Sequence, residues 1–284
     1  MTARETRAAL REARVRPSKG LGQNFLVAAP IARAIAAACV HDDEVGRARV
    51  VEIGAGTGAL TRLLAERAGA LVAVERDRRL LAVLEGNLAA SSARVVHADA
   101  LSTDLRELLG DARPASPRVL CGNLPYAITG AMLRRTIEVA ACVERVVYMV
   151  QREVAERLAA RPGTKQWGAL TVFVRAAFDV HRLLRVPPGA FHPRPAVDSA
   201  VVELVPARPR HAEESDRFVS LVRGAFASRR KTLRNAWAGL APDRTTLERA
   251  ATLAGVALDA RGETLDVDAF ARMAGALEAI SDRP

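Results

Sequence analysis

Apolar runs of four to six residues alternate with amphipathic helical stretches between residues 49 and 150. The runs are rich in Val, Ile and Leu, as strands buried on both faces are, and the stretches between them have helical spacing. This alternation is typical of βαβ units and a parallel sheet, so we expect an α/β fold with a doubly wound sheet and helices on both faces. The expected strands are 49–53, 71–75, 94–98, 118–122 and 145–150, and the expected helices lie near 59–67, 77–88 and 129–140.

The segments that flank this region are less regular. Residues 1–20 carry many arginines in a weakly helical context and end in a Pro- and Gly-containing stretch, which favours a basic, mobile arm. A polar turn at 23–26 leads into a helix over 31–40, with Pro30 in its first turn. After residue 150 we expect a helix at 153–160, a loop at 161–168, an apolar stretch at 170–186 that ends at a Pro-Pro-Gly turn, and a last strand at 199–205.

The remaining chain has helical periodicity throughout. A Pro- and charge-rich segment at 206–216 marks a domain boundary. Beyond it, Thr245 and Glu248 have the spacing of a capping box before a helix that Gly255 ends. We therefore expect a basic arm at 1–20, an α/β domain at 21–207 and a small helical domain at 208–284. The apolar positions of its first and last helices are Phe218, Leu221, Val222, Ala225 and Phe226, then Phe270, Met273 and Leu277.

The net charge of +10 and the pI of about 10.7 change this picture by suggesting a polyanionic partner. Lysine and arginine that meet phosphates release counterions, so nucleic acid is the usual candidate, although a well-solvated surface would give the same composition. The three cysteines lack CxxC spacing, which predicts neither a disulfide framework nor a zinc site. Without an apolar leader or a run of roughly 20 apolar residues, a soluble cytoplasmic protein is expected.

The first expected strand leads into a glycine-rich turn, Gly54-Ala55-Gly56-Thr57-Gly58. Glycine suits a turn with positive φ and lets a ligand approach the backbone. The pattern alone fits a dinucleotide fingerprint or a purely structural tight turn. Glu75 ends the next strand about twenty residues later, where a carboxylate accepts both ribose hydroxyls of an adenosine, a requirement that NAD and S-adenosylmethionine share. Glu75 could equally be an exposed charge near a helix start.

Two further strand ends carry polar side chains. Asp99 follows the third strand, where an acid can receive the adenine amino group of a cofactor or simply cap the next helix. The fourth strand ends at Asn123-Leu124-Pro125-Tyr126. This tetrad resembles the Asn/Asp-Pro-Pro-Tyr segments that mark, at this position, enzymes that methylate an exocyclic amino nitrogen, and hydride transfer has no use for it. Since the carboxyl ends of parallel strands share one edge of the sheet, we expect these groups to lie together.

With these motifs the sequence resembles the ribosomal RNA adenine N6-dimethyltransferases over roughly residues 16–284. Within that family it is similar to the small-subunit branch, notably at residues 163–168 and 193–199. The segments that carry the resemblance are Leu21-Gly22-Gln23-Asn24-Phe25-Leu26, residues 51–58, the tetrad, Val150-Gln151-Arg152-Glu153-Val154, residues 187–202 and Arg229-Arg230-Lys231-Thr232-Leu233-Arg234-Asn235.

The resemblance implies a role for each matching residue. Cofactor binding falls to Asn24, Leu26, Gly54, Gly56, Glu75, Asp99 and Asn123, with S-adenosyl-L-methionine as the cofactor. The tetrad residues Asn123, Leu124, Pro125 and Tyr126 form the catalytic segment, and Tyr126 and Phe191 line the target-base pocket. We expect Arg229, Arg230, Lys231 and Arg234 to contact RNA phosphates, followed by Arg14, Arg16 and Lys19, although each could equally be a solvated charge.

The implied activity is dimethylation of N6 on two adjacent adenines near the 3′ end of small-subunit (16S) rRNA. The expected partner is this rRNA, in a partly assembled 30S subunit, and the expected state is a monomer. Ala127 and Trp167 depart from the family pattern. The resemblance therefore defines the methyl transfer more firmly than it defines which nucleotide is the target. The alternatives are a large-subunit (23S) rRNA methylase, an NAD(P)-dependent oxidoreductase and a non-catalytic RNA-binding assembly factor.

Overall fold

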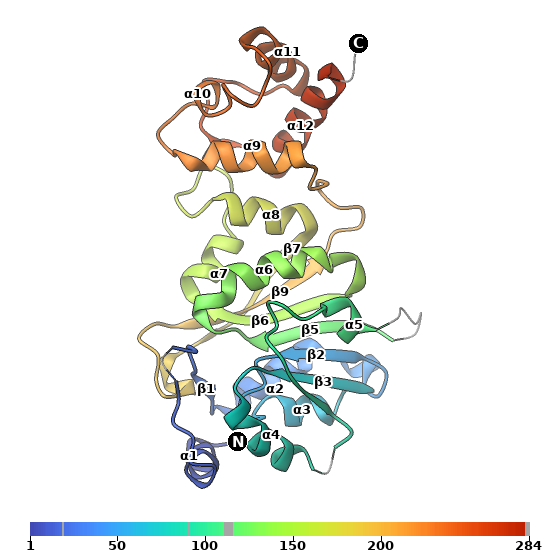
Figure 1. The fold of residues 1–284 in the computed structure, drawn as a ribbon, viewed down its shortest axis with the longest axis vertical. Coiled ribbons are helices and arrows are strands. Elements are labelled where there is room, and N and C mark those ends of the chain that lie inside the picture. The colour runs from blue at the N-terminus through green and yellow to red at the C-terminus, as the bar shows by residue number, and fades with distance from the viewer. Residues whose placement is uncertain (19, 90, 111–115, 282–284) are drawn as a thin grey trace. The chain divides into compact units, whose positions relative to one another are not determined.

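A seven-stranded sheet forms from the apolar runs, in the order β4-β3-β2-β5-β6-β9-β7 (Figure 1). The computed structural model describes residues 1–18, 20–89, 91–110 and 116–281. Neighbouring strands from β4 to β6 are parallel, and β9 is antiparallel to β6. The strands are β2 (Arg49–Ile53), β3 (Ala70–Glu75), β4 (Arg94–His97), β5 (Arg118–Asn123), β6 (Arg145–Gln151), β7 (Phe178–Val186) and β9 (Ser199–Pro206). The predicted doubly wound α/β fold is confirmed, with strand limits within about one residue.

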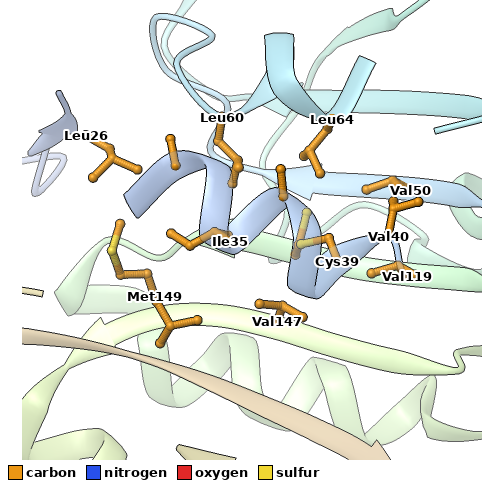
Figure 2. Close-up of a cluster of buried hydrophobic side chains, with 14 of the residues drawn as sticks. Leu26, Ile35, Cys39, Val40, Val50, Leu60, Leu64, Val119, Val147 and Met149 are labelled. Atoms are coloured by element: carbon orange, nitrogen blue, oxygen red, sulfur yellow. The ribbon is translucent and has the colours of Figure 1, made fainter. Parts of the chain in front are cut away.

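Helices cover both faces of this sheet. Val147 of β6 packs with Ile35 of α2 (Ala29–Cys39), and Figure 2 shows this apolar cluster around α2. The next residue, Tyr148, points to the opposite face and meets Thr136 of α6 (Thr129–Glu138). Alternation along one strand therefore places α2 and α6 on opposite faces. The other helices of this region are α3 (Thr61–Ala65), α4 (Arg78–Leu88) and α5 (Leu105–Leu109).

The strand order fixes where a ligand site lies. From β2 the chain runs outward through β3 and β4, and then returns to β5 on the other side of β2. The carboxyl ends of β2 and β5 therefore border the topological switch point, where α/β sheets bind ligands. The predicted side chains at the ends of β2, β3, β4 and β5 all follow this edge.

The apolar stretch at 170–186 divides into two elements that its hydropathy does not separate. Residues Ala169–Ala177 form α8, and the chain then continues as strand β7 without a loop. A second sheet is also missing from the prediction, because its antiparallel strands β1 (Phe25–Leu26) and β8 (Phe191–His192) have only two residues each. Two residues carry no periodicity that a sequence could reveal.

The N-terminal arm expected at 1–20 is instead an ordered element, and that expectation is wrong for most of its length. Residues Ala3–Glu12 form α1, and Thr2 and Glu5 complete a capping box at its start. The apolar side chains of Leu10 and Val15 are buried with Phe25 and Leu80. Lys19 lies outside the described residues.

The chain divides into two compact units, Met1–Ala155 with Val180–Pro206, and Glu156–Asp179 with Ala207–Pro284. The second unit thus includes residues 156–179, which the predicted boundary at 207 assigned to the α/β domain. Its core contains Phe173, Phe218, Phe270 and Trp237 in edge-on contacts. Its principal helices after residue 207 are α9 (Asp216–Ala227), α10 (Leu233–Ala236), α11 (Arg244–Ala254) and α12 (Val267–Ser281), and α7 (Arg152–Leu158) joins the units in the chain.

One predicted helix start needs correction. Asp243, not Thr245, caps α11 by accepting a hydrogen bond from the Thr246 backbone N–H at 2.7 Å. Aspartate is as good an N-cap as threonine, so the capping-box spacing was misleading. Gly255 ends α11 in the left-handed conformation, as predicted. Within the described ranges, no helix is both long enough and apolar enough to cross a membrane.

Candidate functional site

A cavity opens at the carboxyl edge of β2, β3, β4 and β5, with about 930 Å³ of empty space including its mouth. The loop at 20–25 and the segment at 123–128 form its other walls. Nine of the predicted site residues line it together: Asn24, Gly54, Gly56, Glu75, Asp99, Asn123, Leu124, Pro125 and Tyr126.

The glycine turn after β2 has the backbone that the sequence predicted. Gly54 has φ 72° and Gly56 has φ 59°, a region where a side chain is strained. A Cβ on Gly56 would also come within 3.1 Å of the Phe25 ring. Gly122, directly before the tetrad, was not singled out from sequence, yet a Cβ there would lie 2.3 Å from the Ile53 carbonyl oxygen. Glycine at 122 therefore lets β5 run close beside β2.

Glu75 reaches from the end of β3 into this turn. Its carboxylate accepts the Gly56 N–H at 2.8 Å and the Asp77 N–H at 2.7 Å, and the residue is 7% exposed. Burial raises the pKa of Glu75, and the backbone N–H donors oppose that shift. Glu75 is thus a buried acceptor fixed against the glycine turn, and the reading of an exposed charge is excluded.

Asp99 lies at the cavity and is also bound to the turn that follows it, whereas Asp104 caps the next helix, α5. One carboxylate oxygen accepts the Leu101 N–H at 3.0 Å, which ties it to the following turn, and the other lies 3.3 Å from Arg76 Nη1. The residue also lines the cavity beside Ala98 and Ala100. The expected helix cap is therefore wrong for Asp99, and its contact with the turn leaves it at the cavity.

Asn123 joins two walls of the cavity. Its side-chain Nδ2 donates to the Asn24 carbonyl oxygen at 2.9 Å, and Asn24 Nδ2 donates to the Gly22 carbonyl at 3.2 Å. No group in the described part of the chain donates to Asn123 Oδ1. The Leu124 N–H donates to the Met149 carbonyl at 3.1 Å. The amide oxygen that the predicted chemistry requires is thus available as an acceptor while the other end of the amide is fixed.

Two predicted site residues lie elsewhere. Phe191 and Leu26 face each other across the β1–β8 pair and are 5% exposed in the core around α2. Neither is among the residues that line the main cavity, so Phe191 does not accompany Tyr126 there. Leu26 borders a smaller adjoining cavity of about 410 Å³. A sequence shows that an aromatic residue is near other site residues along the chain. It does not show toward which side of its strand the aromatic side chain points.

Gln23 is a site residue that the sequence motif contained without a stated role. Its Nε2 donates to Asp77 Oδ2 at 2.9 Å, and its Oε1 accepts the Ser18 N–H at 2.8 Å. Asp77 also binds Arg79 at 2.6 Å, and this guanidinium lowers the pKa of Asp77 to about 2. The loop over the cavity is thereby attached to the start of α4, next to Glu75.

Glu52 is a second residue that sequence reasoning passed over. It lines the smaller cavity, is 2% exposed, and its Oε2 has no hydrogen-bond partner in the described structure. Burial, together with the nearby charge of Glu75, raises the pKa of Glu52 to about 7. Its position at the penultimate residue of a buried strand is the signal that could have identified it, because an acid is rarely left there without a function.

The raised pKa of Glu52 predicts a pH-dependent stability. The folded state binds the Glu52 proton more tightly than the unfolded state, so the free energy of unfolding falls as pH rises from about 4.5 through about 7. We expect Glu52→Gln to remove this loss. The free energy of unfolding of Glu52→Gln minus that of the wild type should be about 3 kcal/mol larger above pH 7 than at pH 4. Urea unfolding across this range measures it, with exposed Glu85→Gln as the control. A constant difference between wild type and Glu52→Gln would contradict the prediction.

The predicted RNA-contact residues of the second unit fall into two classes. Arg229 Nη2 donates to the Trp167 carbonyl at 3.0 Å and pairs with Glu263 at 3.1 Å. Arg234 pairs with Glu248 at 2.7 Å. Arg230 and Lys231 are exposed, and no carboxylate pairs with either within the described ranges. Arg229 and Arg234 thus have structural bonds, whereas Arg230 and Lys231 present free charge.

The chain is similar to proteins of known classes over nearly all its length. A family model described as ribosomal RNA adenine dimethylase matches residues 15–278. The ribosomal RNA small subunit methyltransferase A of Geobacter metallireducens is 42% identical over 275 residues, which cover 95% of this chain and 98% of that protein. The protein of the same name from Moorella thermoacetica is 42% identical over 284 residues, or 96% of each.

Solved structures show the same architecture. A dimethyladenosine transferase from Plasmodium falciparum has a TM-score of 0.71 at 23% identity, covering 88% of this chain and 95% of that one, which shows the fold. The 23S rRNA methyltransferase ErmE has a TM-score of 0.67 at 28% identity, covering 90% of this chain and all of that one. The strand order and the cavity described above therefore belong to a class I methyltransferase architecture.

Proposed function

The chain belongs to the ribosomal RNA adenine dimethylase family, and on that premise we propose that it dimethylates N6 of two adjacent adenines near the 3′ end of small-subunit rRNA. The observation that carries this proposal is Asn123, which ends β5 at the cavity with its amide oxygen free to accept. The relatives named as small-subunit methyltransferases match nearly the whole chain, which supports the small-subunit target over the large-subunit alternative.

The cofactor of this methyltransferase is S-adenosyl-L-methionine, which displaces the hypothesis of an NAD-dependent enzyme. When bound, it supplies an electrophilic methyl group on a sulfonium. The residues present fit it, because the glycine backbone leaves room for close approach and buried acids face the same cavity. We assign the ribose hydroxyls to Glu75 and the adenine amino group to Asp99. The unpartnered oxygen of Glu52, in the adjoining cavity, suits a cationic group such as the methionine ammonium.

Asn123 and Leu124 would orient the target nitrogen. Adenine N6 is a weak nucleophile because its lone pair is delocalised into the ring. If Asn123 Oδ1 and the Leu124 carbonyl oxygen each accept one N6–H bond, the nitrogen is held nearer to tetrahedral geometry and its lone pair is directed at the methyl group. The proton that N6 loses passes to water, since the methylated ammonium is acidic. Positioning of this kind supplies at best about 7–11 kcal/mol.

Tyr126 would bind the target base by stacking. It lines the cavity two residues after Leu124, at the start of a 3-10 turn over Tyr126–Ile128. Base stacking on an aromatic ring contributes about 1–3 kcal/mol. This offsets part of the few kcal/mol that it costs to take an adenine out of a stack.

The partner proposed is small-subunit rRNA within a partly assembled 30S subunit, and the proposed state is a cytoplasmic monomer. The test uses methyl-labelled cofactor with small and large ribosomal subunits from a strain that lacks these methylations, followed by mapping of the modified bases. We expect label on two neighbouring adenines of the small subunit. Label in the large subunit would favour the ErmE-like activity, and binding to the small subunit without label would favour a non-catalytic assembly factor.

The two exposed cations of the second unit give a prediction on RNA binding. We expect Arg230→Ala and Lys231→Ala each to weaken RNA binding and to reduce the slope of log affinity against log salt by about 0.7–0.9, since each contact releases about one counterion. Arg234→Ala should chiefly lower stability, because it leaves Glu248 with one cation fewer. Affinity titrations at several salt concentrations measure the slopes. An unchanged slope in both exposed variants would remove this segment from the RNA interface.

A further inference from the structure

The phenol of Tyr126 is bound by a buried serine. Tyr126 Oη lies 3.0 Å from Ser199 Oγ, and Ser199 is only 1% exposed. Ser199 is the first residue of β9 and is 73 residues away from Tyr126 in the chain. A hydroxyl so deeply buried needs a partner, and Tyr126 provides one. The aromatic ring at the cavity is thus connected to the sheet at its far end.

Contacts on both sides of Ser199 hold this anchor in place. β9 runs antiparallel to β6 with Ser199 opposite Gln151. The preceding residue, Asp198, accepts the Arg152 N–H on its carbonyl at 2.9 Å. Its carboxylate binds Arg152 Nη1 at 3.1 Å and Arg185 Nη2 at 2.7 Å. The start of β9 is therefore tied to β6 and to β7, and the hydroxyl of Ser199 has a defined position.

The backbone of the tetrad is fixed separately from the ring. The Leu124 N–H is bound to the Met149 carbonyl of β6, and Thr129 Oγ1 donates to the Pro125 carbonyl at 3.2 Å. With the backbone set, only the two side-chain torsions of Tyr126 remain to be fixed. A hydrogen bond at Oη fixes χ1 by holding the end of the ring in place. Oη lies on the axis of χ2, so χ2 is limited because the phenol hydroxyl and its hydrogen bond favour the plane of the ring.

We propose that Ser199 is a positioning residue, which sets the plane of the Tyr126 ring before the target adenine arrives. This inference rests on the proposed function, because it assumes that Tyr126 stacks on that base. A phenylalanine at 126 would keep the stacking surface and lose the anchor. An alanine at 199 would leave the tyrosine with a free phenol. Both changes act on one and the same interaction.

A double-mutant cycle tests the coupling. We expect Ser199→Ala and Tyr126→Phe each to lower kcat/KM for unmethylated small subunits about five- to tenfold, with S-adenosylmethionine affinity within twofold of wild type. The double variant should be no worse than either single variant. The matched control is Tyr148→Phe, which removes a second buried tyrosine–hydroxyl bond, to Thr136 Oγ1 at 2.9 Å. We expect it to lower stability and to leave kcat/KM within twofold. Losses that multiply in the double variant would overturn the proposal.

A second measurement needs neither RNA nor activity. The chain has two tyrosines, so ring-selective 13C labelling gives NMR signals for Tyr126 and Tyr148 alone. We expect Ser199→Ala to increase the mobility of the Tyr126 ring and to leave Tyr148 unchanged as an internal reference. Equal ring order in wild type and Ser199→Ala would refute the positioning role. If wild type transfers no methyl but the ring loosens in Ser199→Ala, the proposed function fails while the anchoring of Tyr126 by Ser199 stands.

Discussion

Replacing Asn123 by alanine should reduce methyl incorporation into small-subunit rRNA by at least about 10²–10³-fold, the usual cost of removing one group that binds the transition state. The variant loses the free Oδ1 acceptor at the cavity, and no other side chain of the described site takes its place. RNA affinity should stay within a few-fold, because the expected phosphate contacts lie elsewhere in the chain. Single-turnover methyl transfer and RNA titration measure the two effects separately.

Asn123→Asp separates the two ends of the amide. Aspartate keeps an acceptor oxygen but cannot donate to the Asn24 carbonyl, which Asn123 Nδ2 contacts at 2.9 Å. If the acceptor is the essential atom, Asn123→Asp should retain more activity than Asn123→Ala. Equal losses in the two variants would assign the role to the Asn24 contact instead, and wild-type turnover in Asn123→Ala would refute the assigned chemistry altogether.

The sheet and the edge where the site lies were predictable because both follow from periodic patterns. Buried parallel strands appear in the sequence as continuous apolar runs. Their carboxyl ends meet at one edge of the sheet, whatever side chains the connecting helices carry. The positions of Gly54, Glu75, Asp99 and Asn123 on one cavity follow from strand order alone. That explains why motif residues at strand ends could be grouped correctly before any contact was known.

Short-range geometry was not predictable in the same way. Phe191 was expected beside Tyr126, but a two-residue strand pair turns it into the core. The contacts of Ser199 with Tyr126 and of Gln23 with Asp77 join residues 73 and 54 positions apart. No period or local motif encodes such contacts. The ordered α1 was misread because its arginines suggested an arm, although Thr2 and Glu5 carried a capping signal.

Replacing Glu75 by alanine should weaken S-adenosylmethionine binding by about 100-fold or more. Each hydrogen bond from a ribose hydroxyl to a carboxylate contributes about 1.5–3 kcal/mol, and two are lost together. The variant also removes the acceptor of the Gly56 N–H, which donates to Glu75 at 2.8 Å. The glycine turn is then no longer held in the conformation that the cofactor binds. Isothermal titration with S-adenosylmethionine measures the change directly.

Glu75→Gln tests whether the shape of the side chain suffices without the carboxylate. Glutamine keeps the shape and one acceptor oxygen, but its amide nitrogen would face either the Gly56 N–H or the Asp77 N–H, and the two donors would repel each other. Its affinity should therefore lie close to that of Glu75→Ala, whereas exposed Glu85→Ala should bind as the wild type does. A dissociation constant for Glu75→Ala within threefold of wild type would show that Glu75 supports the turn without holding the ribose.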